Sequence, residues 1–241
     1  MRTTYKSAAA DQTGVPEQTI TSWSETLERA AATGAHHASV YPLSVEDGTP
    51  MQVAVDSGLV AEPDPDLAAE MMVLAEESLG YHALGRYEVA NYAEDRAHES
   101  RHNTAYWTGR PYLGIGPGAH GMLDAPTALA IGVARELAPD AARVRYGNAP
   151  SIEDWLVLRG DTTETLTAEE AAREDVMLGM RLVRGVPAEQ VAEAGLTPSL
   201  ESLARDGLAE LAGEGAAARW RTTRRGWLLG NQVFGRIWAG E

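Results

Sequence analysis

The residue types best suited to chemistry lie in residues 99–121, which read ESRHNTAYWTGRPYLGIGPGAHG. An imidazole and an amide stand side by side at His102 and Asn103, and two aromatic rings follow at Tyr106 and Trp107. An imidazole nitrogen can ligate a metal, and aromatic rings offer flat apolar surfaces. The combination therefore predicts contact with a planar, metal-bearing ligand. The alternative is that His102 only hydrogen-bonds within a loop and that both aromatic residues are core.

This stretch resembles the C-terminal part of the catalytic domain in the oxygen-independent coproporphyrinogen III oxidase and haem chaperone family of radical-SAM proteins. The haem chaperone (HemW-like) branch is the nearer match, because its signature His-Asn-x-x-Tyr stands here at residues 102–106. Further segments are similar to the family in the same order: residues 14–19 (GVPEQT), 39–50 (SVYPLSVEDGTP) and 87–93 (YEVANYA). The resemblance covers roughly residues 14–238, and several ordered matches are more specific than one motif.

The resemblance implies site residues and cofactors. It places His102, Asn103, Tyr106 and Trp107 against haem, with His102 as a candidate ligand of the haem iron, and it gives Ser44 and His120 positions that approach S-adenosylmethionine (SAM). The family's [4Fe-4S] cluster is held by cysteine thiolates. The 241 residues contain no cysteine, so this chain cannot support the cluster in the usual way and no catalytic residue is predicted.

The family's cluster segment and its first SAM contacts lie upstream of everything matched, so we expect a family member whose N-terminal portion is absent. Three hypotheses follow. The chain binds haem or a porphyrin without radical chemistry of its own, with a haem-accepting protein as a further partner; or it completes a barrel with a separate chain; or it is a nonfunctional truncated product.

Composition narrows the choice of partners and location. The formal net charge is −15, which disfavours nonspecific binding to nucleic acid. No run approaches 18 apolar residues and no signal-peptide core is present, so we expect no membrane span and a cytoplasmic location.

Strands and helices alternate in the first half of the chain. Strands are predicted at residues 38–45, 87–91 and 112–116, and Asp64 and Pro65 form an N-cap and N1 pair that opens a helix ending at Gly80. A helix capped by Ser22 or Ser24 precedes them. Alternation predicts parallel α/β architecture, and the resemblance implies the last part of an incomplete β/α barrel at residues 14–150. An atypical leader at residues 1–13 precedes it, in which residues 8–12 include no β-branched or aromatic residue where the family has a buried apolar strand.

A second region is predicted at residues 151–241. A capping box at residues 167–170 opens a helix closed by Gly185, and residues 197–198 open another. A hairpin at residues 216–225 and a last helix follow, so the region resembles the family's winged-helix-like C-terminal domain. Its wing carries four arginines, but the helix at residues 199–212 is acidic, which argues against DNA binding.

One motif is rejected. Residues 116–121 satisfy the dinucleotide-binding pattern G-x-G-x-x-G, but Pro117 removes an N–H from a loop that should donate to pyrophosphate. The acidic partner of such a motif would be Glu136, which falls in a helical run at residues 127–137. We interpret the segment as a strand that meets a tight turn at the barrel mouth, where ligands bind in such folds.

Overall fold

The computed structural model describes residues 8–157 and 160–241, so residues 1–7 of the predicted leader lie outside the described residues. The chain divides into an N-terminal unit, Met1–Ser100, and a C-terminal unit, Arg101–Glu241. The sequence placed a boundary at residue 150 instead. That position lies between two strands of one sheet, whose backbone hydrogen bonds tie both sides together.

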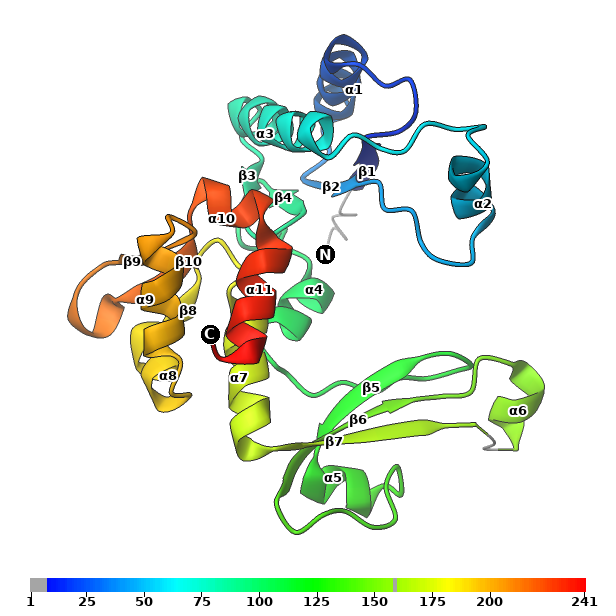
Figure 1. Ribbon diagram of the computed structural model, residues 1–241, viewed down its shortest axis with the longest axis vertical. Coiled ribbons are helices and arrows are strands. Elements are labelled where there is room, and N and C mark those ends of the chain that lie inside the picture. The colour runs from blue at the N-terminus through cyan, green and yellow to red at the C-terminus, as the bar shows by residue number, and fades with distance from the viewer. Residues whose placement is uncertain (1–7, 158–159) are drawn as a thin grey trace, which may run out of the picture. The chain divides into compact units, whose positions relative to one another are not determined.

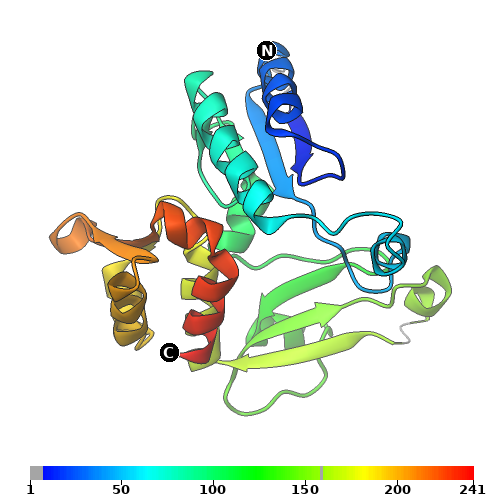
Figure 2. The same ribbon diagram turned by 45° about the horizontal axis from the view of Figure 1, so that its top comes forward.

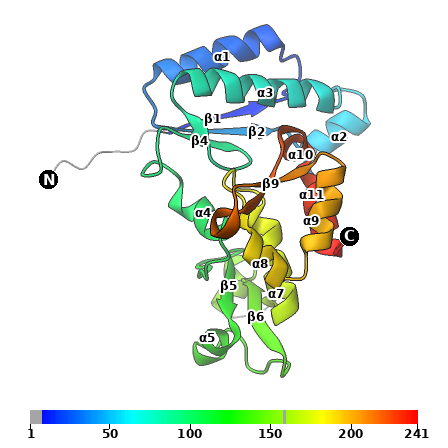
Figure 3. The ribbon, with the colours of Figure 1, turned by 90° about the vertical axis from the view of Figure 1, so that its left-hand side faces the viewer.

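The N-terminal unit is a four-stranded sheet covered by helices. Its strands follow the order β1-β2-β4-β3. Helices α1 and α3 lie side by side on one face of the sheet (Figure 3). In chain order the elements are β1 (Ala8–Thr13), α1 (Ile20–Ala32), β2 (His37–Pro42), α2 (Pro50–Asp56), α3 (Pro65–Tyr81), β3 (Gly85–Arg86) and β4 (Asn91–Ala93).

The core between these helices is centred on Trp23, which is fully buried and donates its indole N–H to the carbonyl of Met71 at 2.8 Å. The predicted Asp64 cap of α3 is confirmed, since its carboxylate accepts from the N–H groups of Asp66 and Leu67. Helix α1 is capped by Thr19 rather than by Ser22 or Ser24. Ser22 sits at the third helical position and closes the capping box, so its polar side chain marks the first turn but not the cap.

The C-terminal unit contains two antiparallel sheets, of order β5-β6-β7 and β8-β10-β9 (Figures 1 and 2). Helices α7 and α11 lie side by side. The elements are α4 (Arg101–Trp107), β5 (His120–Asp124), α5 (Ala125–Ala130), β6 (Ala141–Gly147), α6 (Ile152–Leu156), β7 (Thr162–Thr167), α7 (Ala168–Gly179), β8 (Val186–Pro187), α8 (Ala188–Glu193), α9 (Thr197–Arg205), β9 (Ala209–Ala212), a 3-10 turn (Gly215–Ala217), β10 (Arg219–Thr222), α10 (Arg224–Leu228) and α11 (Gly230–Ala239).

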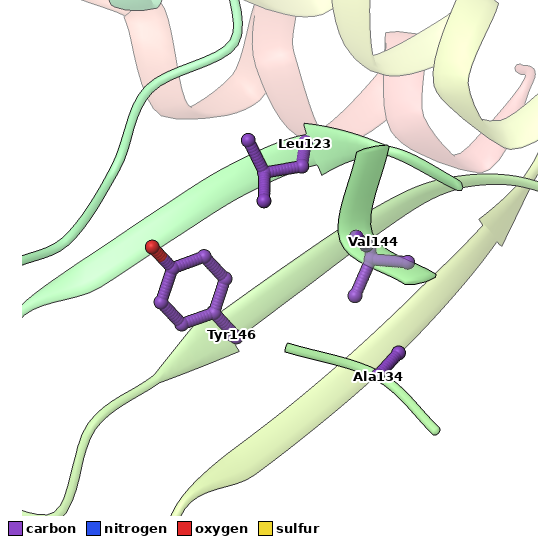
Figure 4. Close-up of a cluster of buried hydrophobic side chains, with 5 residues drawn as sticks. Leu123, Ala134, Val144 and Tyr146 are labelled. Carbon is purple, nitrogen blue, oxygen red and sulfur yellow. The ribbon is translucent and has the colours of Figure 1, made fainter. Parts of the chain in front are cut away.

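Sheet β5-β6-β7 is backed by its own small core. Leu123 and Val144 meet Tyr146 and Ala134 there (Figure 4), together with Ala128. The predicted helix at residues 127–137 is wrong beyond Ala130, because α5 ends there and Gly132 takes a positive φ of 76°. The rest of that segment folds over the sheet as a loop.

The prediction of parallel strands holds for one pair only. Strands β1 and β2 are parallel, whereas every other pairing in the described ranges is antiparallel. Residues 87–90 are the turn between β3 and β4, not a strand, and such a short connection can join only antiparallel neighbours. Residues 8–13 form a strand despite their alanine-rich composition, because the parallel ladder to β2 uses backbone groups and not side chains.

The C-terminal elements differ from prediction mainly at helix ends. The capping box of Thr167 and Glu170 is confirmed, but α7 ends at Gly179 and not near Gly185. The helix predicted at residues 199–212 stops at Arg205, since Gly207 has a φ of 71° and the chain then enters strand β9. The predicted last helix is two helices, α10 and α11. No helix in the described part of the chain is long and apolar enough to span a membrane.

Candidate functional site

Helix α4 carries the side chains that the sequence singled out. His102 and Tyr106 lie four residues apart, hence on one face of the helix, and their rings meet edge to face at 4.7 Å between centroids. Tyr106 in turn meets Tyr112, from the segment after α4, at 4.5 Å in the same geometry. The three rings form a continuous row, the aromatic row, that begins at the exposed imidazole of His102.

Trp107 lies apart from this row. It follows His102 by five residues, which turns it roughly 140° around the helix. The guanidinium of Arg181 lies 5.1 Å from the centre of its ring and 4.1 Å from that of Phe234. Trp107 therefore anchors α4 against the helical part of the unit through a shared cation–π contact. Asn103, the neighbour of His102, is half-buried.

The end of α4 explains why a glycine stands at position 109. Gly109 has a φ of 63°, a left-handed conformation that stops the helix. A Cβ at this position would lie 2.2 Å from Oδ1 of Asp175, so only glycine lets the carboxylate approach. The helix end and α7 are thereby held in close contact.

An ion-pair network, Arg143 and Arg145 with Glu174 and Asp175, lies beside the aromatic row. Glu174 is almost fully buried and accepts from Nη1 of Arg143 at 2.8 Å and from Nη1 of Arg145 at 2.5 Å. Burial acts to lower the pKa of Arg143, but its hydrogen bonds to Asp175 and Glu174 outweigh burial and hold that pKa above its ordinary value. Burial, then the nearby Tyr106 and Glu174, raise the pKa of Tyr112, so its phenol stays neutral.

The glycine-rich segment after Tyr112 folds back onto sheet β5-β6-β7. Only Tyr112 makes a bridge, to Met122, so the predicted strand at residues 112–116 is wrong. The N–H of Gly114 donates to the Tyr146 hydroxyl, while Asn148 donates to the carbonyl of Gly116. These backbone groups are used inside the protein, which fits the rejection of the dinucleotide-binding reading. The segment precedes an antiparallel strand, so it is not the end of a parallel barrel strand.

The two predicted SAM positions fall in different units of the chain. His120 is exposed at the start of β5 in the C-terminal unit, where its ring lies over Gly147. Ser44 is exposed after β2 in the N-terminal unit. Contact of these two residues with SAM stays a prediction.

A buried polar cluster in the N-terminal unit was missed. Tyr87 lies 3.0 Å from Nε2 of His37 and accepts the N–H of Ser100, and burial raises the pKa of Tyr87 to about 12. Glu88, 1% exposed, accepts from the backbone of Ala90 and the amide of Asn91. In the sequence, the polar residues of this cluster were visible in the run at residues 87–93. That run was used only to support the family resemblance, and no chemical role was predicted for it. Polar residues in this turn point inward and close the β3–β4 hairpin.

Comparison with known proteins identifies relatives of the chain. The family profile of the HemN C-terminal domain matches residues 166–229. The sequence is 33% identical to the heme chaperone HemW of Bacillus subtilis (strain 168) over 233 residues, covering 92% of this chain and 56% of the relative. It is 32% identical over 225 residues to the heme chaperone HemW of Mycobacterium tuberculosis (strain ATCC 25618 / H37Rv), covering 91% of this chain and 52% of the relative. The chain thus spans about half the length of these curated relatives.

A solved structure supports the fold. The structure described as "Coproporphyrinogen III oxidase (HemN) from Escherichia coli is a Radical SAM enzyme" matches with a TM-score of 0.66 and 15% sequence identity. The match covers 96% of this chain and 54% of that one. At this identity the likeness concerns the mixed α/β fold alone.

Proposed function

The chain belongs to the HemW- and HemN-like family of radical-SAM proteins, and from that membership we propose that it binds haem or a porphyrin on α4, without radical chemistry of its own. The observation that carries the proposal is the aromatic row His102–Tyr106–Tyr112, which starts at an exposed imidazole. Relatives named heme chaperones supply the ligand class.

The residues on α4 fit a haem. Imidazole is a common axial ligand of haem iron, and His102 presents one on the surface of the unit. Tyr106 and Tyr112 line the approach, and an aromatic contact adds about 0.5–1.5 kcal/mol beyond the apolar area it buries. Asn103 adds an amide beside the imidazole. We assign Trp107 to holding α4 in place rather than to haem contact, because Arg181 lies over its ring.

The residues do not fit an iron–sulfur cluster. Such clusters are held by cysteine thiolates, and the chain has no cysteine. We therefore assign no step of SAM cleavage to this chain.

A haem titration followed by Soret absorbance tests the proposal. His102→Ala should shift the Soret band and weaken binding, because the iron loses its imidazole. His82→Ala is the matched control, since His82 pairs with Glu28 in the other unit. Equal titrations of wild type, His102→Ala and His82→Ala would contradict the proposal.

The sheet edge of the N-terminal unit favours a second candidate function. In the strand order β1 is terminal, so within the described residues one edge of β1 has no neighbouring strand. An open edge is a template for a strand of another chain. We propose as the alternative that a separate chain completes the barrel here. Co-expression with the N-terminal half of the B. subtilis relative, followed by gel filtration, would detect a stable complex, and separate elution would count against it.

We propose that the C-terminal domain is winged-helix-like and that its wing packs within the protein and does not bind DNA. Its order α7–β8–α8–α9–β9–β10 suits that fold. The arginines of the wing are engaged inside the domain. Arg219 donates to the carbonyls of residues 184 and 185, Arg221 pairs with Glu210 at 2.7 Å, and Arg225 donates to the carbonyl of Asp206.

A further inference from the structure

Three metal-binding side chains, none of them assigned above to haem or SAM, meet at one end of the N-terminal sheet. His36, Glu94 and His98 each offer one ligand atom, and these atoms lie within 4.8 Å of one another. We propose that they form a binding site for a divalent transition metal ion of the Zn²⁺ type, the His36–Glu94–His98 site.

The sheet itself brings two of the ligands together. Strands β2 and β4 are antiparallel with His37 opposite Ala93, so the next residues outward, His36 and Glu94, also face each other. The N–H of Glu94 donates to the carbonyl of His36 at 3.1 Å, which extends the ladder by one pair. Side chains directly opposite in an antiparallel pair are close neighbours. Here Nδ1 of His36 lies 2.6 Å from Oε2 of Glu94.

A turn built on Asp95 delivers the third ligand. Oδ1 of Asp95 accepts the N–H groups of Ala97 and His98, at 2.8 and 3.1 Å, and so fixes the loop after β4. The loop stacks the ring of His98 on that of His36, with centroids 4.8 Å apart and 27° between the planes. Glu94 and His98 lie 58 and 62 residues after His36 along the chain. The fold thereby brings two imidazoles and a carboxylate together.

Asp95 also orients His98 for coordination. Its Oδ1 lies 2.8 Å from Nδ1 of His98, and a carboxylate there favours the proton on Nδ1 and leaves the lone pair on Nε2. A carboxylate behind a histidine ligand is a recurrent feature of metal sites, because it holds the ring and raises its basicity.

The donor set selects the kind of ion. Imidazole nitrogen and carboxylate oxygen bind Zn²⁺ at about 2.0–2.2 Å, whereas Ca²⁺ and Mg²⁺ take oxygen ligands. Ligands of one tetrahedral Zn²⁺ ion lie about 3.4 Å apart. The ligand side chains of His36, Glu94 and His98 are 44%, 48% and 25% exposed, so they have room to rotate toward that spacing. Three protein ligands leave a fourth position to water.

Competition between the tag-free full chain and a chromophoric chelator for Zn²⁺ tests the site. The wild type should bind one equivalent, and Co²⁺ in its place should give the visible absorption of a low-coordinate nitrogen–oxygen site. His98→Ala should lower the affinity at least tenfold. Asp95→Asn should lower it by about 10–100-fold, as is typical for the loss of such an orienting partner, without removing a ligand.

The control is His82→Ala. His82 also pairs with a carboxylate, Glu28 at 3.3 Å, but no third ligand is found with it among the described residues. This variant and His102→Ala should bind Zn²⁺ like the wild type, which separates the site from the proposed haem contact. The inference is overturned if the wild type takes up no stoichiometric Zn²⁺ at micromolar concentration. It is equally overturned if neither His98→Ala nor Asp95→Asn, each folded by circular dichroism, weakens binding.

Discussion

Replacement of Glu174 by alanine should destabilise the C-terminal unit by several kilocalories per mole. The Glu174 side chain is 4% exposed and its two oxygens bind Arg143 and Arg145 at 2.8 and 2.5 Å. The Arg143 side chain is itself only 13% exposed, so its charge would be left buried with Asp175, 28% exposed, as its partner. Removing one partner of a buried ion pair typically costs about 3–5 kcal/mol.

Urea unfolding followed by tryptophan fluorescence measures this loss, because five of the six tryptophans lie in the C-terminal unit. With a urea slope of about 2 kcal/mol/M, the predicted loss lowers the midpoint by about 1.5–2.5 M. Glu169→Ala is the matched control. Glu169 is on the same helix and pairs with Arg173 four residues on, but it is 79% exposed, so the loss should be about 0.3–0.5 kcal/mol.

The double variant Arg143→Met, Glu174→Leu separates charge from packing. An apolar pair of similar volume often replaces a buried ion pair at little cost, so the double variant should unfold at higher urea than Glu174→Ala. A Glu174→Ala midpoint no lower than that of Glu169→Ala would refute the argument. A double variant less stable than Glu174→Ala would also refute it, since the buried Arg143 charge would not then be the source of the loss.

Three further outcomes are expected. Glu170→Gln should destabilise the chain at pH 7, and the loss should shrink as the pH falls. The N–H of Thr167, and then its hydroxyl, hold the pKa of Glu170 below its usual range, so the stabilisation is present above about pH 4.3 and is lost as pH falls through the lowered pKa. Thermal unfolding across the acid range measures the difference, and a difference that does not shrink with falling pH would contradict this. Anaerobic iron–sulfur reconstitution of the isolated chain should yield no [4Fe-4S] cluster and no 5′-deoxyadenosine from SAM, because no thiolate is available, and turnover would disprove it. A mobility-shift assay with duplex DNA at low salt should detect no binding, because the net charge is −15 and Arg221 is paired with Glu210. Sub-micromolar, salt-sensitive binding would show that the wing contacts DNA.

The sequence alone determined features that depend on neighbours in the chain. The cap at Asp64 and the capping box at Thr167 and Glu170 were predictable, because a side chain there bonds to a backbone N–H two or three residues on. The placement of His102 and Tyr106 on one helical face follows from their spacing once residues 101–107 are helical. The family, too, was readable from ordered motifs.

The tertiary structure decided everything that depends on chain reversal and long-range pairing. Alanine-rich residues 8–13 became a strand because β2 supplies a backbone ladder. Residues 87–90 became a turn because β3 and β4 pair antiparallel and the Glu88 carboxylate accepts the N–H of Ala90 across the turn. Trp107 was given a packing partner by Arg181, which is 74 residues away along the chain and lies over its ring. The His36–Glu94–His98 site has no local signature at all. Its ligands meet only because the register of β2 on β4 sets His36 against Glu94 and the Asp95 turn returns His98 to them.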